Sequence, residues 1–562
     1  MFRASDEAGL QRNPLSALSR GDMRFAASLG DDFSDAYYNA EREAARSELA
    51  ALAKIDRASL TGDDRVAYDV FKWQRTLDLQ GLTGDVFTAS VVRPIDHFNG
   101  FHSGVANLSS GQGIAPYKTV ADYENGLSRL TGFAPLVDRA IMRMQQGLDS
   151  GIVQPKLVMN NVLEQLDAML AEGVEGSSFY RPILNFPAEV PAADQARLKA
   201  AYTAQITDDI RPALTRLRDF IRGTYLPKAR DSVGLLDMKG GPALYRHLVA
   251  ASTTTDLTPE AIHQIGLGEV KRYQAEMEAV KAQVGFTGTL KEFFEHIRTD
   301  PKFKPKSREA LRDGYFAIGA RLEATLPKLF STVPRAPLDI RAVPALTEKG
   351  AARGSYQPGT PDGSRPGVFN FNAYDLPSRT TPGMETLYLH EGKPGHHFQI
   401  SLAQENEKLP SFMRFGGNTA YVEGWGLYAE TLGRELGMYT DPYQYFGYLD
   451  SQLFRAIRLV VDTGIHAKGW TRDRTIQYIL DNSSRGRSNA TAETERYIAM
   501  PGQALAYKIG QRKISELRAR AEKALGPRFD IREFHAQVLM TGALPLAVLD
   551  RKIDDWIAAK RS

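Results

Sequence analysis

Apolar residues recur at the three- and four-residue spacing of an amphipathic helix over most of this 562-residue chain. A helix with one apolar stripe must bury it against other elements, so a long succession of such segments restricts the chain to a large, mainly helical fold. Thr258-Pro259 is a clear helix start, with a capping hydroxyl before a proline in the first turn. The segments predicted to be helical are 35–55, 66–79, 123–146, 192–222, 259–284, 308–329, 386–404, 420–436, 444–467 and 504–525.

One stretch, residues 341–375, breaks this pattern because it is rich in Gly and Pro. Within it, residues 367–374 read as a strand, and Pro358-Gly359 and Pro361-Asp362-Gly363 are turn signals before it. We therefore expect a small β-sheet just upstream of the segment that begins at residue 386. The strand is expected to lie at an edge of this sheet, where a peptide backbone can add to it.

No internal repeat, low-complexity linker or sharp boundary divides the chain. The mildest seam lies near residues 234–241, where a mainly helical first part meets the part that carries a histidine-rich motif. We predict one continuous body of two lobes, an N-terminal helical lobe over 1–240 and a second lobe over 241–562. A deep cleft is expected between them.

Charge and composition argue against several classes of function. The 70 Lys and Arg residues nearly balance the 67 Asp and Glu residues, and no basic stripe with interleaved aromatics occurs, so a nucleic-acid partner is not expected. The absence of cysteine excludes disulfides, thiolate ligands and a cysteine nucleophile. No segment has the roughly 20 apolar residues that span a bilayer, and the first residues show no signal-peptide core. The oligomeric state stays open.

The run from His390-Glu391 through Pro394-Gly395 to His396-His397 predicts a metal centre. In a helical zinc motif two histidines four residues apart share one ion, and a glutamate beside the first acts as general base, but here the fourth position is proline. In a regular helix His396 would point about 120° away from His390, and His397 would lie about 10.5 Å along the axis. A two-residue bulge at Lys393 to Gly395 would bring His396 back to the face of His390. His397 is the alternative ligand, which needs a larger bulge.

A third ligand is expected from the next helix. Glu423 and Glu430 share one face of that helix but lie about two turns apart, so only one of them reaches the ion. We predict Glu423, because Gly424 and Gly426 beside it let another helix approach closely. Two histidines and a glutamate leave a fourth position for water, which is the catalytic form of a zinc site, so one Zn²⁺ per chain is expected. Glu391 would be the general base.

These residues also resemble the signature of a bacterial family, the domain of unknown function 885, and the resemblance covers most of the chain. Asn13-Pro14 with Gly21-Asp22 is similar to the family's opening, and 361–367 with Asn372 to the strand before its metal motif. The similarity continues in the segments 423–425, 462–466, 495–497 and 501–508.

The family is regarded as zincin-like, so the resemblance implies a fold similar to thimet oligopeptidase, neurolysin and carboxypeptidase Taq. It implies hydrolysis of amide or peptide bonds in short peptides by an exported protein, periplasmic or secreted, with a cytoplasmic location as the alternative. The family's first histidine after Pro-Gly corresponds to His396. In the related oligopeptidases a histidine and a tyrosine from C-terminal helices stabilise the oxyanion. The candidates here are Tyr507, which ranks first, His466 and Tyr497.

Substrate contacts are expected from the last third of the chain. Arg458 and Arg496 have the chemistry to hold a substrate carboxylate, which would favour carboxypeptidase over oligopeptidase action. The structural alternative for either arginine is an ion pair with Asp462 or Glu493. Tyr507 has its own alternative, a position half buried between helices. The alternatives for His466 are a substrate contact or a position at a helix C-terminus, facing the helix dipole. The remaining predicted substrate contacts are Tyr497, Asn372 and Gln503.

The sequence thus favours a zinc-dependent metallopeptidase or related amide hydrolase. The main alternative is a non-catalytic protein that holds peptide or metal in the same fold. Glu391 beside His390 argues against it, because a metal store needs no general base. A purely structural zinc is usually closed by four protein ligands, often cysteine, and this chain has no cysteine.

Overall fold

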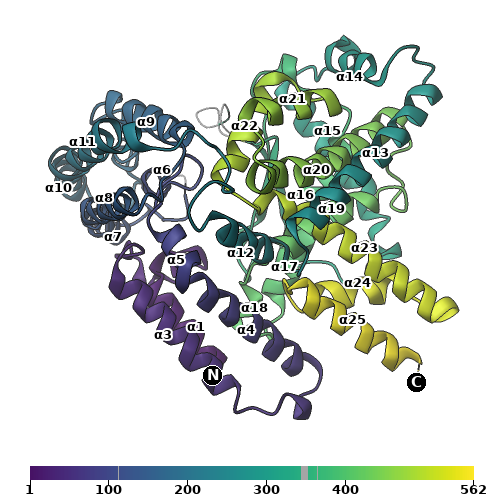
Figure 1. Ribbon diagram of the computed structural model, residues 1–562, viewed down its shortest axis with the longest axis horizontal. Helices are drawn as coiled ribbons and strands as arrows, with labels where there is room; N and C mark the ends of the chain where they lie inside the picture. Colours follow the sequence, from purple (N-terminus) through teal and green to yellow (C-terminus); the bar gives the residue numbers. More distant parts are fainter. Residues whose placement is uncertain (112, 344–347, 349–351, 364, 562) are drawn as a thin grey trace. The chain divides into compact units, whose positions relative to one another are not determined.

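The computed structural model describes residues 1–561 except 112, 344–347, 349–351 and 364. The described chain is mainly helical and contains a three-stranded sheet, so the predicted fold class is confirmed at this level (Figure 1). Its internal contacts divide it into two compact units. One unit comprises 1–55, 74–247 and 498–500, and the other 56–73, 248–497 and 501–562. None of the helices in the described ranges combines the length and apolar character needed to cross a membrane.

Helices build the first unit around buried aromatic side chains such as Tyr123, Phe133 and Tyr202. The predicted helix over 123–146 is wrong in one respect, because it is two helices that meet at Gly132. The helices of this unit are α1 (Phe2–Arg12), α2 (Pro14–Ser19), α3 (Asp35–Leu52), α5 (Gly84–Val91), α6 (Phe101–Leu108), α7 (Val120–Thr131), α8 (Phe133–Ser150), α9 (Lys156–Ala171), α10 (Ala192–Gln205) and α11 (Arg211–Phe220). Two further helices run from one unit into the other, namely α4 (Gly62–Gly81) and α12 (Gly241–Thr253).

The second unit contains the histidine-rich motif and most of the long helices. The closest helix pairs are α13 with α20 and α19 with α23. Its helices are α13 (Pro259–Gln283), α14 (Leu290–Thr299), α15 (Arg308–Glu323), α16 (Met384–Glu391), α17 (His396–Glu405), α18 (Ser411–Arg414), α19 (Thr419–Thr431), α20 (Pro442–Lys468), α21 (Arg472–Asn482), α23 (Ala506–Leu525), α24 (Ile531–Leu539) and α25 (Leu546–Arg561), together with α22 (Arg487–Ala499), whose last residues belong to the first unit.

The sheet lies upstream of α16, as predicted, but its strand order differs from the expectation. Strand β3 (Gly367–Phe371) is the central strand, paired in parallel with β1 (Leu338–Ala342) and antiparallel with β2 (Gly354–Gln357). The prediction of an edge strand is therefore wrong, because both edges of β3 are already hydrogen-bonded. Its neighbours are short and lie apart in sequence, so the local pattern did not indicate them.

Candidate metal centre

The histidine-rich motif lies at a break between two helices. The predicted single helix over 386–404 is wrong: α16 ends at Glu391, and α17 begins at His396. The interruption covers Gly392 to Gly395, so it is larger than the two-residue bulge expected. A side chain at Gly395 would collide with the carbonyl oxygens of Leu389 and His390, so this close approach requires glycine.

The break is fixed from outside by helix α19. Trp425 is fully buried, and its indole Nε1 donates a hydrogen bond of 2.9 Å to the carbonyl oxygen of Pro394. Pro394 also has no N–H that could donate to the carbonyl of His390, so ending α16 before this residue sacrifices no helical hydrogen bond there. The helix that carries Glu423 therefore also anchors the turn that aims His396.

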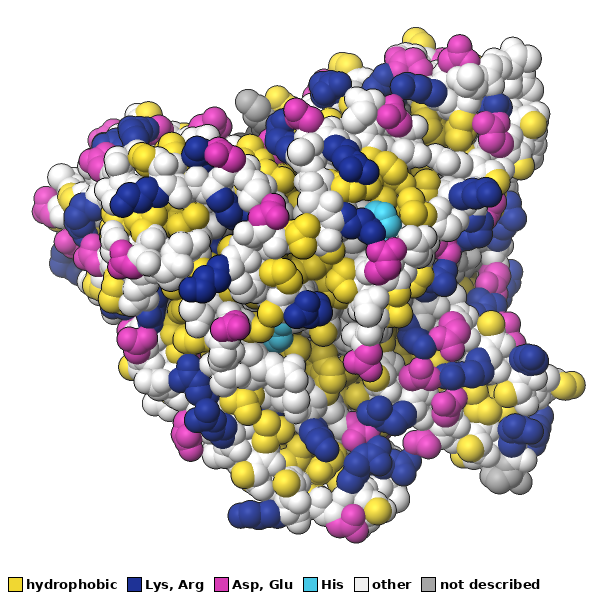
Figure 2. Space-filling model, viewed as in Figure 1, with side chains coloured by type: hydrophobic (Ala, Val, Ile, Leu, Met, Phe, Trp, Pro, Cys, Tyr) yellow, Lys and Arg dark blue, Asp and Glu magenta, His cyan; other side chains and the backbone are white. Residues whose placement is uncertain are grey.

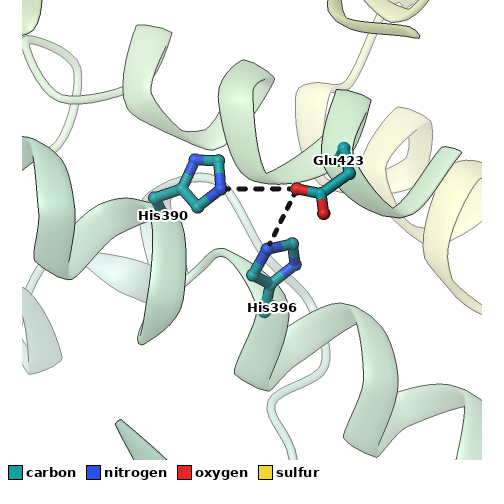
Figure 3. A group of neighbouring side chains, drawn as sticks. All are labelled: His390, His396 and Glu423. Carbon is teal, nitrogen blue, oxygen red and sulfur yellow. Dashed lines mark ion pairs between the residues drawn. The ribbon is translucent and has the colours of Figure 1, made fainter. Parts of the chain in front are cut away.

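His390, His396 and Glu423 converge on one point (Figure 3). One ligand atom from each of them lies within 4.8 Å of the others. Glu423 Oε2 is 3.7 Å from His390 Nε2 and 3.6 Å from His396 Nε2. The two imidazole rings are nearly perpendicular, with an interplanar angle of 87°. The side chain of Glu423 remains 21% exposed, so the group is open to solvent on that side.

A buried carboxylate orients the first of these histidines. Glu430 Oε1 accepts a hydrogen bond of 2.9 Å from His390 Nδ1, which leaves Nε2 directed at Glu423. Glu430 is held in turn by Ser451 Oγ at 3.1 Å and by Gln452 Nε2 at 2.9 Å. A carboxylate behind a histidine ligand fixes its tautomer and increases its basicity, and this is the usual environment of metal-binding imidazoles.

The electrostatics of the group favour a cation. Burial would lower the pKa of His390, but Glu423, Glu430 and Glu391 outweigh it and raise the pKa to about 9. Burial would raise the pKa of Glu423, but the two histidines outweigh it and hold that pKa well below its usual range. Without metal, His390 therefore keeps a proton at neutral pH, and a metal ion would have to displace that proton.

The donor set fits zinc. Tetrahedral bonds of about 2.0–2.1 Å place neighbouring ligand atoms about 3.3 Å apart, slightly closer than the spacings between Glu423 and the two histidines. Helix α19 leaves room for both rings at Gly426, where a Cβ atom would lie 2.9 Å from His390 Cε1 and 3.1 Å from His396 Cε1. Gly424 has the other role expected, since its Cβ would lie 2.5 Å from the backbone of Gly510 on α23.

The neighbouring histidine faces a different part of the molecule. His397 is fully buried, and its Nδ1 lies 3.1 Å from the hydroxyl of Tyr356 on β2. Burial lowers the pKa of His397 to about 4, so the ring is neutral near pH 7. The structure therefore groups His396, and not His397, with the other two predicted ligands. Glu391 is the last residue of α16, next in sequence to the predicted ligand His390, and its side chain is largely buried.

Four of the predicted substrate contacts form one network around Glu493. Arg458 Nη2 is 3.0 Å from Glu493 Oε2, and its Nε donates to the Tyr497 hydroxyl at 3.0 Å. That hydroxyl donates to Glu493 at 2.5 Å. Arg496 lies 3.7 Å from Glu493 and donates to Gln503 Oε1 at 2.8 Å. The ion-pair alternative is thus realised with Glu493 for both arginines.

The other predicted site residues have separate surroundings. His466 Nε2 lies 2.9 Å from the carbonyl oxygen of Tyr497, which links α20 to α22. Asn372 donates to the Glu348 carbonyl at 2.7 Å and accepts from the Tyr374 amide at 2.8 Å, so its side chain supports the turn after β3. Tyr507 is buried on α23.

The sequence did not indicate the series of hydrogen-bonded polar side chains behind His390, which runs through Glu430 and Gln452 to Lys508. The sequence suggested Glu430 only as an alternative ligand, not as a hydrogen-bond partner of His390. Its seven-residue distance from Glu423 did indicate that both carboxylates lie on the same face of their helix. Lys508 was not singled out, yet it is fully buried and donates to Gln452 Oε1 at 2.6 Å and to the Tyr273 hydroxyl at 3.0 Å. Burial lowers the pKa of Lys508 to about 7. Partners this far apart in sequence leave no local pattern.

Figure 2 shows Lys and Arg side chains interspersed with Asp and Glu over the face in view. This agrees with the near balance of the two charges in the sequence.

Similar proteins were found among solved structures and protein families. A protein of Colwellia psychrerythraea described as a “putative lipoprotein” is 28% identical, with a TM-score of 0.93 over 99% of this chain and 98% of its own. A “putative lipoprotein of unknown function” of Shewanella oneidensis is 19% identical, with a TM-score of 0.74 and 98% of each chain covered, and shares the fold. No curated protein matches significantly. The profile of the bacterial proteins of unknown function called DUF885 matches residues 14–553, so the chain belongs to this family.

Proposed function

We propose that the protein is a zinc-dependent hydrolase that cleaves amide or peptide bonds of short peptides. The observation that carries this proposal is the convergence of His390, His396 and Glu423, with ligand atoms within 4.8 Å of one another. Glu430 behind His390 adds the outer support that such a site requires. Three protein ligands leave a position for water, which distinguishes a catalytic from a structural zinc.

The residues around this site have complementary roles in the proposed reaction. When bound, zinc would lower the pKa of a water molecule and polarise the scissile carbonyl. Glu391 would accept a proton from the attacking water and donate it to the leaving amine. Tyr507 is the proposed hydrogen-bond donor to the oxyanion, because it lies on α23, the helix that packs closely on α19, which carries Glu423.

Two finer expectations belong to the same proposal. A zincin-like architecture, with substrate bound in a cleft, is supported by the order of the site along the chain: a His-Glu pair, a second histidine, then a glutamate on the following helix. Export to the periplasm or beyond is supported by the description of the similar Colwellia protein as a lipoprotein. Fractionation of cells that produce the full protein would test the location.

Metal content and one substitution test the function. Purified protein should hold about one zinc per chain, as a single three-ligand site requires. Glu391→Gln should retain zinc and lose hydrolysis of a peptide library by orders of magnitude, since only the base is removed. The matched control is Glu385→Gln, on the same helix, where the buried carboxylate pairs with Arg321 and accepts from the Tyr439 amide. This control should reduce stability but keep activity.

Each outcome has a distinct meaning. A protein that binds zinc but cleaves no peptide would be a metal-binding protein of the same fold, and the hydrolase proposal would be wrong. Full activity in Glu391→Gln would remove Glu391 from the mechanism. Absence of bound zinc after purification and zinc addition would overturn the metal centre itself.

A further inference from the structure

Three arginines of the second unit surround two aromatic rings, those of Phe454 and Tyr507. Arg455 and Arg458 lie one turn apart on α20, and Arg485 follows α21. The guanidinium carbons of Arg458 and Arg485 are 5.0 and 4.4 Å from the centre of the Phe454 ring. Those of Arg455 and Arg458 are 5.9 and 4.7 Å from the centre of the Tyr507 ring. We call Arg455, Arg458 and Arg485 the arginine cluster.

The carboxylates nearby do not balance this charge. Arg458 pairs with Glu493, but Glu493 is shared with Arg496 at 3.7 Å. Burial would raise the pKa of Glu493, and the charges of Arg458 and Arg496 outweigh it and lower the pKa to about 2. Glu493 is therefore fully ionised near pH 7, and its single charge is divided between two guanidinium groups.

The other two arginines are less well matched. Arg485 lies 3.3 Å from Asp450. Arg455 forms no ion pair within the described residues, and its Nη1 donates to Ser451 Oγ at 2.8 Å. Burial and the charges of its cluster neighbours lower the pKa of Arg455, although Glu430 acts in the opposite direction. The cluster thus concentrates more positive charge than its own acidic partners neutralise.

Each arginine of the cluster also has a donor without an acceptor. In the part of the chain that the structure describes, Arg455 Nε, Arg458 Nη1 and Arg485 Nε are buried and form no hydrogen bond. Arg458 as a whole is only 6% exposed. A buried N–H without an acceptor is costly, more so on a charged group. A carboxylate carries two oxygens that accept several hydrogen bonds in the plane of a guanidinium, so it suits these donors.

The cluster is joined to the candidate metal centre by hydrogen bonds. Arg455 donates to Ser451 Oγ, and Ser451 donates to Glu430 at 3.1 Å. Glu430 accepts from His390 Nδ1 at 2.9 Å. The side of the cluster formed by Arg485 and Glu493 reaches solvent, with side chains 19% and 17% exposed. A ligand at the cluster would therefore be connected to His390 through Ser451 and Glu430 and would lie in reach of solvent.

We propose that the arginine cluster binds a free carboxylate of the substrate, so that the protein acts on peptides or acylated amino acids with an unblocked carboxyl group. This inference rests on the proposed hydrolase function for its substrate role, but the carboxylate site itself does not require hydrolysis. It favours carboxypeptidase-type over internal cleavage.

Binding of a matched pair of ligands tests the site without any turnover. N-acetyl-L-phenylalanine and its amide differ only in the free carboxyl group, and calorimetry of both should show the acid binding at least about tenfold more tightly, as a multidentate guanidinium contact implies. Zinc-loaded and chelator-treated proteins are compared, because a carboxylate held by zinc itself would lose its preference once the metal is removed. Equal binding of acid and amide, or a preference that disappears with the metal, would overturn the proposal.

Substitutions then locate the site. Arg455→Gln removes no ion pair, so it should fold and reduce the preference for the acid to within about twofold. Arg458→Lys is the second variant and should reduce it partly, because an ammonium group lacks the guanidinium fork. The matched control is Arg143→Gln in the first unit, where a buried arginine pairs with Asp35. The control should leave the preference intact, and an undiminished preference in both cluster variants would contradict the assignment.

Hydrolysis distinguishes the two proposals. If free and C-terminally amidated peptides are cleaved with equal kcat/KM, the hydrolase stands and the carboxylate site is wrong. If the acid binds at the cluster but no peptide is cleaved, the carboxylate site stands and the hydrolase is wrong.

Discussion

Replacing Gly426 by alanine tests whether the two histidine rings must keep their present positions to bind metal. The added Cβ would lie 2.9 and 3.0 Å from His390 Cε1 and Nε2, and 3.1 Å from His396 Cε1. Carbon atoms prefer separations of about 3.5–4.0 Å, so both rings must move by roughly half an ångström. Glu430 holds one of these rings from behind, which limits how it can turn.

The expected loss can be worked out from the cost of turning the rings. A side chain turned about 30° from its preferred rotamer costs roughly 0.5–1.5 kcal/mol, so two rings give roughly 1–3 kcal/mol. Zinc binding to Gly426→Ala should therefore weaken about 5- to 150-fold. In the metal-free protein the rings need not keep the positions that a shared metal ion requires, so the melting temperature should change less than the metal affinity does.

Competition with a chelating dye measures the zinc affinity directly, and thermal unfolding with chelator measures the metal-free stability. Gly417→Ala is the control, because nothing lies within 4 Å of the Cβ it would add. Gly424→Ala offers a contrast, since its clash with Gly510 should destabilise the packing of α19 on α23 with or without metal. Unchanged zinc affinity in Gly426→Ala would show that the rings do not bind metal from these positions.

Three further predictions concern the surroundings of the site. Glu430→Gln should weaken zinc binding about 10- to 100-fold in the same dye titration, because the charge behind His390 is lost. His396→Ala should abolish zinc binding, whereas His397→Ala should mainly reduce stability, and the opposite result would make His397 the ligand. Burial lowers the pKa of His535 to about 3. Between pH 6.5 and 3, His535 is therefore protonated in the unfolded chain but stays neutral in the folded protein. The free energy of unfolding of the metal-free protein should decrease as the pH is lowered through that window, by up to about 1.4 kcal/mol per pH unit. Urea titrations should show a smaller pH dependence for His535→Gln.

The helices were predictable because their apolar periodicity is local. The candidate ligand set was predicted from residue type and helix geometry, and the structure brings His390, His396 and Glu423 together, as this prediction requires. The form of the break was not predictable, because it depends on Trp425, which contacts Pro394 across 31 positions of sequence. A bulge within one helix and a complete interruption have the same local composition.

The predicted substrate contacts show most clearly what the sequence could not determine. Arg458 was expected to hold either substrate or an acidic partner, and the sequence offered both Asp462 and Glu493. The four-residue spacing favoured Asp462 geometrically, yet this carboxylate accepts from the Gly502 amide at 3.1 Å instead. The choice between the two depends on how α22 packs on α20, which no local pattern records.

The interruption between α16 and α17 also gives the site a contribution from the backbone. A continuous helix would have carried both histidines in its interior, where each peptide dipole is neutralised by its neighbours. Because α16 ends at Glu391, its last carbonyl groups form the negative pole of a helix beside His390. Such a pole attracts a cation, whereas the positive pole at the start of α17, which begins at His396, opposes it by a similar amount. The interruption at Pro394 and Gly395 thus places two opposed helix ends, as well as a second imidazole, next to the candidate metal position.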